Sequence, residues 1–131
     1  MNQYTLLAII FAVVLIFWMF NRGSKTGGVR ISPSEARKRM ESEKGIILLD
    51  VRNRDEYVNR HIPNSTLIPV NVLVSEAGKR LPDKEADIFV YCASGSRSSM
   101  AASILLKLGY TKVFNMGGIS SWPYETVSGN K

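Results

Sequence analysis

The chain has 131 residues, a net charge of +6 and a single cysteine. This length leaves room for one small globular domain beside any anchor, and one cysteine excludes an intramolecular dithiol redox site. The basic residues Arg37, Lys38 and Arg39 alternate with glutamates on one predicted helix, which indicates a solvated helix face. We therefore expect no nucleic-acid partner.

The first predicted element is an uncharged apolar segment from Tyr4 to Phe20. As a helix, about 17 residues span roughly 26 Å, near the lower limit for crossing a bilayer core. A cleaved signal peptide is the alternative, but Met1-Asn2-Gln3 carries no basic side chain and Trp18-Met19-Phe20 is too bulky for a cleavage site. The sequence predicts a transmembrane anchor over residues 1–21.

The basic residues that follow this segment predict its orientation. Arg22, Lys25 and Arg30 lie after the apolar run, and no basic side chain precedes it. Positive charge concentrates on the cytoplasmic side of membrane proteins, so we expect a single-pass protein whose C-terminal domain faces the cytoplasm. A glycine-rich linker is predicted over residues 22–29, and its charges suit anionic lipid headgroups.

Helical and buried strand patterns alternate through the remaining chain. Ser32 begins a helix that runs to about Glu43, the apolar run Ile46–Val51 predicts a strand buried on both faces, and Asp55 begins a short helix. His61–Ser65 is a predicted turn. The elements expected after it are extended chain at Thr66–Pro69, a helix at Asn71–Leu81, a strand at Ile88–Tyr91, a helix at Ser99–Leu108 and a strand at Lys112–Asn115.

This alternation predicts an α/β domain, with a small and mainly parallel sheet flanked by helices. We expect the domain over residues 30–127 and a frayed polar tail over residues 128–131. Sheets of this class place their sites beyond the carboxyl ends of the strands. That edge of the sheet is therefore where the chemistry is expected.

The lone cysteine, Cys92, ends one of these strands and opens the segment Cys92-Ala93-Ser94-Gly95-Ser96-Arg97-Ser98. Small residues let backbone N–H groups turn toward the sulfur, and the next helix presents its positive N-terminus to it. Both effects favour a thiolate, which is the nucleophilic form of cysteine. A buried inert thiol is the alternative.

The N–H groups of Ala93 to Ser98 are also suited to hold an anionic persulfide on Cys92. Arg97 adds a full charge and a planar fork that can hold the loop or bind an anionic donor, unless it is a plain surface arginine. A thiolate here can take the outer sulfur of thiosulfate or of a persulfide and pass it to an acceptor.

Four motifs in order give the chain a resemblance to single-domain rhodanese-like proteins over roughly residues 30 to 125. They are Leu48-Leu49-Asp50-Val51-Arg52 with Glu56-Tyr57, His61-Ile62-Pro63-Asn64-Ser65, Val90 to Ser98, and Asn115-Met116-Gly117-Gly118-Ile119 with Trp122. The resemblance implies a sulfurtransferase whose cysteine carries sulfane sulfur, with no metal and no organic cofactor. It also implies that Asp50 and Arg52 lie near the site as supporting residues.

The remaining motif residues favour structural roles. His61 is the only histidine, and a satisfied turn histidine is favoured over a catalytic base. The chain has Arg60 and Asn64 where the family usually has glycine, and asparagine tolerates the positive φ of such a turn. Gly117-Gly118 predicts a close backbone approach beside the loop, and Trp122 is expected to pack over the core.

Two alternatives to sulfur transfer follow from these residues. A cysteine phosphatase also closes a thiolate cradle with arginine, but four residues separate Cys92 from Arg97 where the phosphatases that resemble this site have five. The second alternative is a non-catalytic, membrane-tethered binding or scaffold module. For a sulfurtransferase, the expected partners are a small sulfur donor and an acceptor, which is a small thiol, a thioredoxin-like protein or a membrane partner held close by the anchor.

Overall fold

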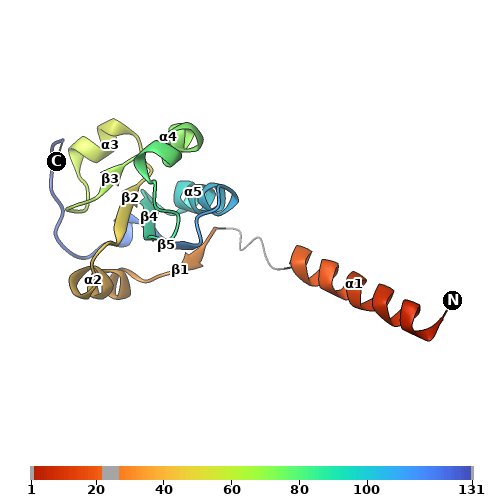
Figure 1. Cartoon of the computed structure of the whole chain (residues 1–131). Coiled ribbons are helices and arrows are strands. Elements are labelled where there is room, and N and C mark those ends of the chain that lie inside the picture. Colours follow the sequence, from red (N-terminus) through yellow and green to blue (C-terminus); the bar gives the residue numbers. More distant parts are fainter. Residues whose placement is uncertain (1, 22–26, 131) are drawn as a thin grey trace.

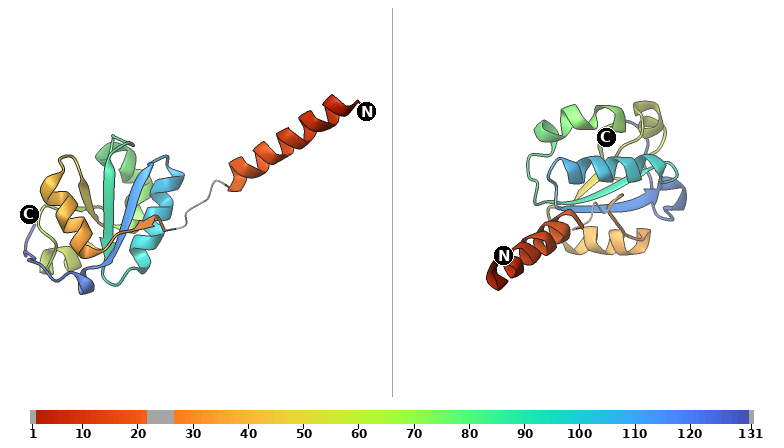
Figure 2. Two further views of the ribbon diagram at one scale, coloured as in Figure 1. Left: turned by 90° about the horizontal axis from the view of Figure 1, so that it is seen from below. Right: turned by 90° about the vertical axis from the view of Figure 1, so that its right-hand side faces the viewer.

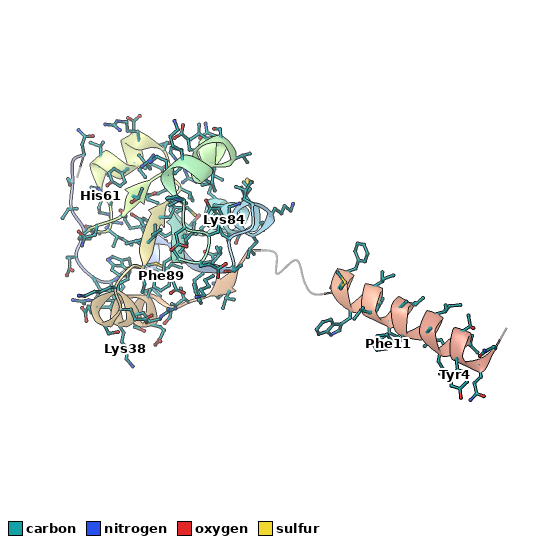
Figure 3. All side chains as sticks on the ribbon, in the orientation of Figure 1. Tyr4, Phe11, Lys38, His61, Lys84 and Phe89 are labelled. Atoms are coloured by element: carbon teal, nitrogen blue, oxygen red, sulfur yellow. The ribbon has the colours of Figure 1, made fainter. Side chains whose placement is uncertain are left out.

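The computed structural model describes residues 2–21 and 27–130. Helix α1 (Gln3–Asn21) contains the predicted apolar segment, and its window Gln3–Phe20 has a mean hydropathy of 2.3 with none of it buried. Tyr4 and Phe11 project from this helix in Figure 3. By length and composition, α1 is able to cross a membrane. The basic residues Arg22 and Lys25, on which the predicted orientation depends, lie outside the described residues.

A five-stranded parallel sheet forms the centre of the domain (Figure 1). The strand order is β1-β5-β4-β2-β3, which confirms the predicted α/β class. The strands are β1 (Val29–Arg30), β2 (Ile47–Asp50), β3 (Thr66–Leu67), β4 (Asp87–Cys92) and β5 (Lys112–Gly118). Because β4 lies in the middle, the sheet carries Cys92 to the centre of its carboxyl edge.

Helices cover both faces of the sheet, as the two views in Figure 2 show. The helical elements are α2 (Pro33–Ser42), α3 (Arg54–Asn59), α4 (Leu73–Arg80), α5 (Ser96–Lys107), and the short 3-10 turns η1 (Val70–Val72) and η2 (Ile119–Ser121). Two apolar cores result. One joins the sheet to α4 and α5 and includes Leu49, Val90, Cys92 and Leu105, and the other joins it to α2 and includes Phe89 and Trp122.

The chain joins the domain earlier than predicted. The backbone N–H of Gly27 donates to Ser103 Oγ at 2.8 Å, and Val29 pairs with Phe114 as the first residue of edge strand β1. Residues 27–29 therefore belong to the folded body and not to the linker. The reason is that β5 offers a free edge that two extended residues can pair with, although their side chains are exposed.

The end of the chain also differs from expectation, because residues 128–130 are bonded to the domain. Ser128 Oγ donates to the carbonyl of Asn59 at 2.9 Å, and Gly129 N donates to the carbonyl of Val58 at 2.8 Å. The side chain of Arg54 donates to Asn130 Oδ1 at 2.9 Å. The expectation of a frayed tail over these residues was wrong, because backbone partners at the end of α3 satisfy their polar groups.

Turn chemistry before β3 agrees with the sequence. Asn64 has a φ of 67°, so the turn keeps the left-handed conformation that glycine would supply. The next helices depart from their predicted starts by a few residues. Val70–Val72 forms a 3-10 turn before α4, where one continuous helix from Asn71 was expected.

Candidate active site

Strand β4 holds the candidate nucleophile. Its residues from Ile88 to Cys92 are all buried, and it is paired on both sides, with β2 and with β5. Cys92 is only 1% exposed and lies at the carboxyl end of this strand. A buried central strand thus positions the sulfur at the start of the loop that follows it.

The turn after Cys92 brings backbone N–H groups to the sulfur. Gly95 has a φ of 115° and is the N-cap of α5, and its N–H donates to Cys92 Sγ at 3.0 Å. The helix begins at Ser96, three residues before the predicted start at Ser99. Glycine permits this early start because positive φ turns the chain sharply. Ser96, Arg97 and Ser98 therefore lie in the first helical turn, close to the sulfur and to the positive end of α5.

Ser98 supplies the side-chain partner of the sulfur. Ser98 Oγ lies 3.5 Å from the Cys92 sulfur and 2.9 Å from the carbonyl oxygen of Gly95, so its hydroxyl proton can turn to the sulfur when Cys92 is a thiolate. Burial raises the pKa of Cys92, but the Ser98 hydroxyl and the N–H groups of Ser98, Gly95 and Ser94 outweigh it, so the pKa is lowered overall. Hydrogen bonds to the charged form stabilise a thiolate.

The carboxyl end of β5 supports the loop from the other side. A Cβ built on Gly118 would lie 2.6 Å from Ser94 Cα and closer still to the carbonyl oxygen of Ala93. That carbonyl accepts a hydrogen bond from Ser120 N at 3.2 Å. Only glycine fits at position 118 in this backbone, as the predicted close approach requires.

A β-bulge places this glycine. Val90 pairs with Asn115, whereas Tyr91 and Cys92 pair with Gly117 and Gly118, so β5 contains one extra residue, Met116. Asn115 Oδ1 accepts from Gly117 N at 2.8 Å. The bulge extends β5 beyond the predicted end at Asn115, because the asparagine side chain bridges the irregular step.

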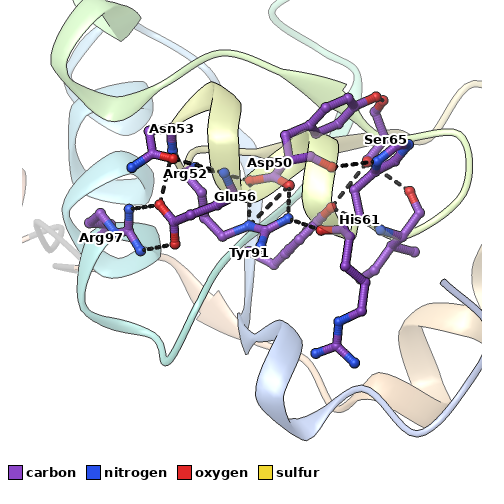
Figure 4. A network of polar contacts seen from close by, with 11 residues as sticks. Asp50, Arg52, Asn53, Glu56, His61, Ser65, Tyr91 and Arg97 are labelled. Carbon is purple, nitrogen blue, oxygen red and sulfur yellow. Dashed lines mark hydrogen bonds and ion pairs between the residues drawn. The ribbon is translucent and has the colours of Figure 1, made fainter. Parts of the chain in front are cut away.

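Asp50 and Arg52 form a buried ion pair at the end of β2. The guanidinium of Arg52 reaches Asp50 Oδ2 at 2.7 Å through Nη2, and it also donates to the carbonyl of Arg60 at 2.7 Å. The pKa of Arg52 is raised, since its bonds to Asp50 outweigh the opposing effect of burial. These contacts join the end of β2 to the turn before His61 (Figure 4).

Arg97 forms a second ion pair, with Glu56 of α3. Its Nη1 and Nη2 atoms lie 2.6 and 2.9 Å from the two carboxylate oxygens of Glu56 (Figure 4). The hydrogen bonds from Arg97 hold the pKa of Glu56 at about 2, although burial opposes this effect. Arg97 therefore connects the first turn of α5 to α3.

His61 is built into the core beside this network. It is fully buried, its ring stacks on Tyr57 with centroids 3.8 Å apart, and its Nδ1 lies 2.8 Å from the Tyr57 carbonyl. The neighbouring Tyr91 hydroxyl donates to Ser65 Oγ at 3.0 Å, and burial raises the pKa of Tyr91. These contacts fit the structural role predicted for His61. Among the described residues, no three of His, Cys, Asp or Glu gather into a group that could hold a metal.

The sequence that forms this domain matches a known protein family. Residues 32–124 match the Rhodanese-like domain, which is more than half of the sequence. The chain belongs to the rhodanese-like family. This match confirms the resemblance inferred from the four motifs.

Similar proteins from bacteria carry rhodanese-like sequence over most of this domain. Thiosulfate sulfurtransferase PspE of Escherichia coli is 33% identical over 81 residues, which are 62% of this chain and 78% of PspE. YrkF of Bacillus subtilis is 33% identical over 97 residues, 73% of this chain, and the match spans about half of that relative (51%). The crystal structure of the Alr3790 protein from Anabaena sp. superposes with a TM-score of 0.71 at 30% identity, covering 76% of this chain and 92% of that one. General sulfur transfer is therefore the activity that the homologues support.

The rhodanese-like site contains one partner that sequence reasoning did not single out. In the sequence Glu56 is only part of the family pattern, whereas in the structure it is bonded to Arg97, 41 residues later. A local signal existed: Asn53 and Glu56 have the spacing of a capping box, and both of its hydrogen bonds are present in α3. That spacing places Glu56 in the first turn of α3, which follows β2. Strand β2 lies next to β4, the strand that ends at Cys92.

Proposed function

We propose that this protein is a sulfurtransferase that carries sulfane sulfur on Cys92, taking it from thiosulfate or a persulfide and giving it to a thiol. The observation that carries the proposal is the hydrogen bond from Gly95 N to Cys92 Sγ at 3.0 Å, at the N-terminus of α5. Together with Ser98 it lowers the pKa of Cys92 and favours a nucleophile near neutral pH.

The first half of the cycle loads the cysteine. The Cys92 thiolate attacks the outer sulfur of thiosulfate, a new S–S bond forms, the S–S bond of thiosulfate breaks, and sulfite leaves with the bonding pair. The product is a Cys92 persulfide anion, so charge is conserved. The loop after Cys92 has backbone N–H groups that are suited to bind this anion, namely those of Ala93, Ser94, Gly95, Ser96 and Ser98.

The second half of the cycle transfers the sulfur from Cys92 to the acceptor. An acceptor thiolate attacks the outer sulfur of the persulfide, the Cys92 S–S bond breaks, and Cys92 returns as a thiolate while the acceptor leaves as a persulfide. No electrons are gained or lost overall. The chain needs no second cysteine for this cycle, in agreement with the single cysteine in its sequence.

The membrane role is part of the proposal. We infer that Tyr4 to Phe20 anchors the protein in a single pass, and that the domain faces the cytoplasm because basic residues follow the span. The anchor would confine the domain to the membrane surface. An acceptor at the same surface would then meet Cys92 at a raised effective concentration.

A non-catalytic binding module is the second candidate. Burial of Cys92, which is 1% exposed, favours it, because a thiol without access cannot meet a donor. Both candidates agree with the fold, so reactivity distinguishes them.

The experiment is intact-mass analysis of the full-length protein in neutral detergent micelles, after incubation with thiosulfate or with a low-molecular-weight persulfide. We expect the mass of one added sulfur, removable by a thiol, on the wild type and none on Cys92→Ser. Equal sulfur uptake by both proteins would contradict the assignment of Cys92. If neither donor adds sulfur and iodoacetamide reacts slowly with the wild type at neutral pH, the binding module becomes the better conclusion.

A further inference from the structure

Arg97 is the only residue in the segment Cys92–Ser98 with a full positive charge. Its guanidinium is paired with a carboxylate. Both of its terminal nitrogens bond to Glu56, at 2.6 and 2.9 Å, and the two side chains are 34% and 28% exposed. Glu56 Oε1 also accepts from Asn53 N at 3.2 Å, as part of the capping box of α3. The capping hydrogen bond thus holds the Glu56 carboxylate in position, and this carboxylate in turn holds the guanidinium of Arg97.

This pairing determines the charge beside Cys92. Arg97 lies in the first turn of α5, directly before Ser98, whose hydroxyl oxygen is 3.5 Å from the Cys92 sulfur. Its charge is balanced by Glu56, just as that of Arg52 is balanced by Asp50. Each of these ion pairs is neutral, so within the loop a donor anion is attracted by the backbone N–H groups and by the helix N-terminus.

We propose that Glu56 is a specificity-determining residue, which neutralises Arg97 and makes the site select uncharged hydropersulfide donors over dianionic thiosulfate. The inference rests on the proposed function and specifies the donor class. Thiosulfate brings two negative charges toward a thiolate, and an unpaired arginine would offset that repulsion.

A hydropersulfide donor avoids the electrostatic repulsion between thiosulfate and the Cys92 thiolate. The Cys92 thiolate attacks the terminal sulfur of R–S–SH, the donor S–S bond breaks, and R–S⁻ leaves with the bonding pair while the proton stays on the transferred sulfur. One negative charge enters the step and one leaves it. The reacting donor is uncharged, so the state of Arg97 has little effect on its approach.

The test is Glu56→Gln in the full-length protein, in micelles of neutral detergent. Glutamine keeps an oxygen that can accept from Asn53 N and removes the charge that balances Arg97. The second-order rate constant of sulfur loading is measured with thiosulfate and with 2-hydroxyethyl persulfide generated in situ. We expect the thiosulfate constant to rise about sixfold, the Coulomb effect of one charge on a dianion at roughly 8 Å in near-aqueous surroundings, and the persulfide constant to stay within about twofold.

The ratio of the two constants is the decisive quantity. Both donors react with the same thiolate, so any change in the ionisation or position of Cys92 affects both and cancels in the ratio. The matched control is Glu43→Gln, which removes the same charge from another bidentate arginine pair, with Arg39, at the opposite end of the sheet. This control should leave the ratio unchanged. The double variant Glu56→Gln with Arg97→Ala should lose the gain.

The salt dependence of thiosulfate loading provides a second readout. Removing the Glu56 charge adds an unbalanced positive charge beside the site, so added salt should slow loading by thiosulfate more in Glu56→Gln than in the wild type. An unchanged ratio in Glu56→Gln, or the same salt response of the thiosulfate reaction in wild type and Glu56→Gln, would overturn the role of Glu56. Loading by neither donor in any variant would instead overturn the proposed function, and this inference with it.

Discussion

Replacing Gly118 by alanine should disable the site through one steric contact. The new Cβ would lie 2.6 Å from Ser94 Cα, where ordinary contacts are 3.4–4 Å, and the Ala93 carbonyl oxygen is closer still. The obstacle is backbone, so no side-chain rotation relieves it, and the segment after Cys92 has to move by about 1 Å. Gly118 itself has a φ of −115°, so the substitution adds no dihedral strain.

Two quantities follow from that displacement. Overpacking of this kind costs about 1–3 kcal/mol of unfolding free energy, and a misplacement of about 1 Å reduces turnover by about a hundredfold. The N–H of Gly95, now 3.0 Å from the Cys92 sulfur, would also leave hydrogen-bond distance. We therefore expect the pKa of Cys92 to rise and its alkylation to need higher pH.

The assay combines thermal melting, sulfur loading followed by intact mass, and the pH profile of iodoacetamide alkylation. The control is Gly45→Ala, where φ is 84° and no atom lies within 4 Å of the added Cβ, far from the loop at the start of β2. It should lower stability by about 1 kcal/mol through backbone strain and leave the alkylation profile unchanged. A Gly118→Ala protein that loads sulfur and alkylates like the wild type would refute the steric argument.

Two further predictions concern ionisation. Ser98→Ala removes the hydroxyl that helps lower the pKa of Cys92, so alkylation at pH 6 should slow about tenfold; an unchanged pH profile would exclude Ser98 from thiolate stabilisation. The pKa of Glu56 is lowered to about 2 from its ordinary 4.5, so its pairing with Arg97 stabilises the fold fully above pH 4.5 and loses that contribution as pH falls toward 2. Thermal melts of wild type and Glu56→Gln should converge over this range, and a difference that does not vary with pH would contradict the pairing.

Most of the fold could be predicted from local patterns in the sequence. The apolar run of β4 and the glycine after Cys92 predict a buried strand that ends in a sharp turn, and Asn64 predicts its own positive φ. Each of these depends on residues adjacent in sequence. The predicted sheet, its helices and the place of Cys92 at the sheet edge were therefore confirmed.

The features that escaped prediction depend on distant partners. Val29–Arg30 becomes a strand only because β5 has an open edge, and residues 128–130 are ordered only because the end of α3 offers carbonyls. The sequence leaves open whether Arg97 holds the loop or binds a donor. Its actual partner, Glu56, lies on another helix and is brought there by the pairing of β2 with β4.

The bulge at Met116 has a consequence for comparing this chain with other family members. The extra residue lies between two regular stretches of pairing, so Gly118 remains opposite Cys92 whether or not that residue is present. A homologue one residue shorter here can keep the same glycine beside its cysteine. An alignment should therefore place its gap at Met116, because a gap after Gly118 would match that glycine to the wrong position and hide a shared site.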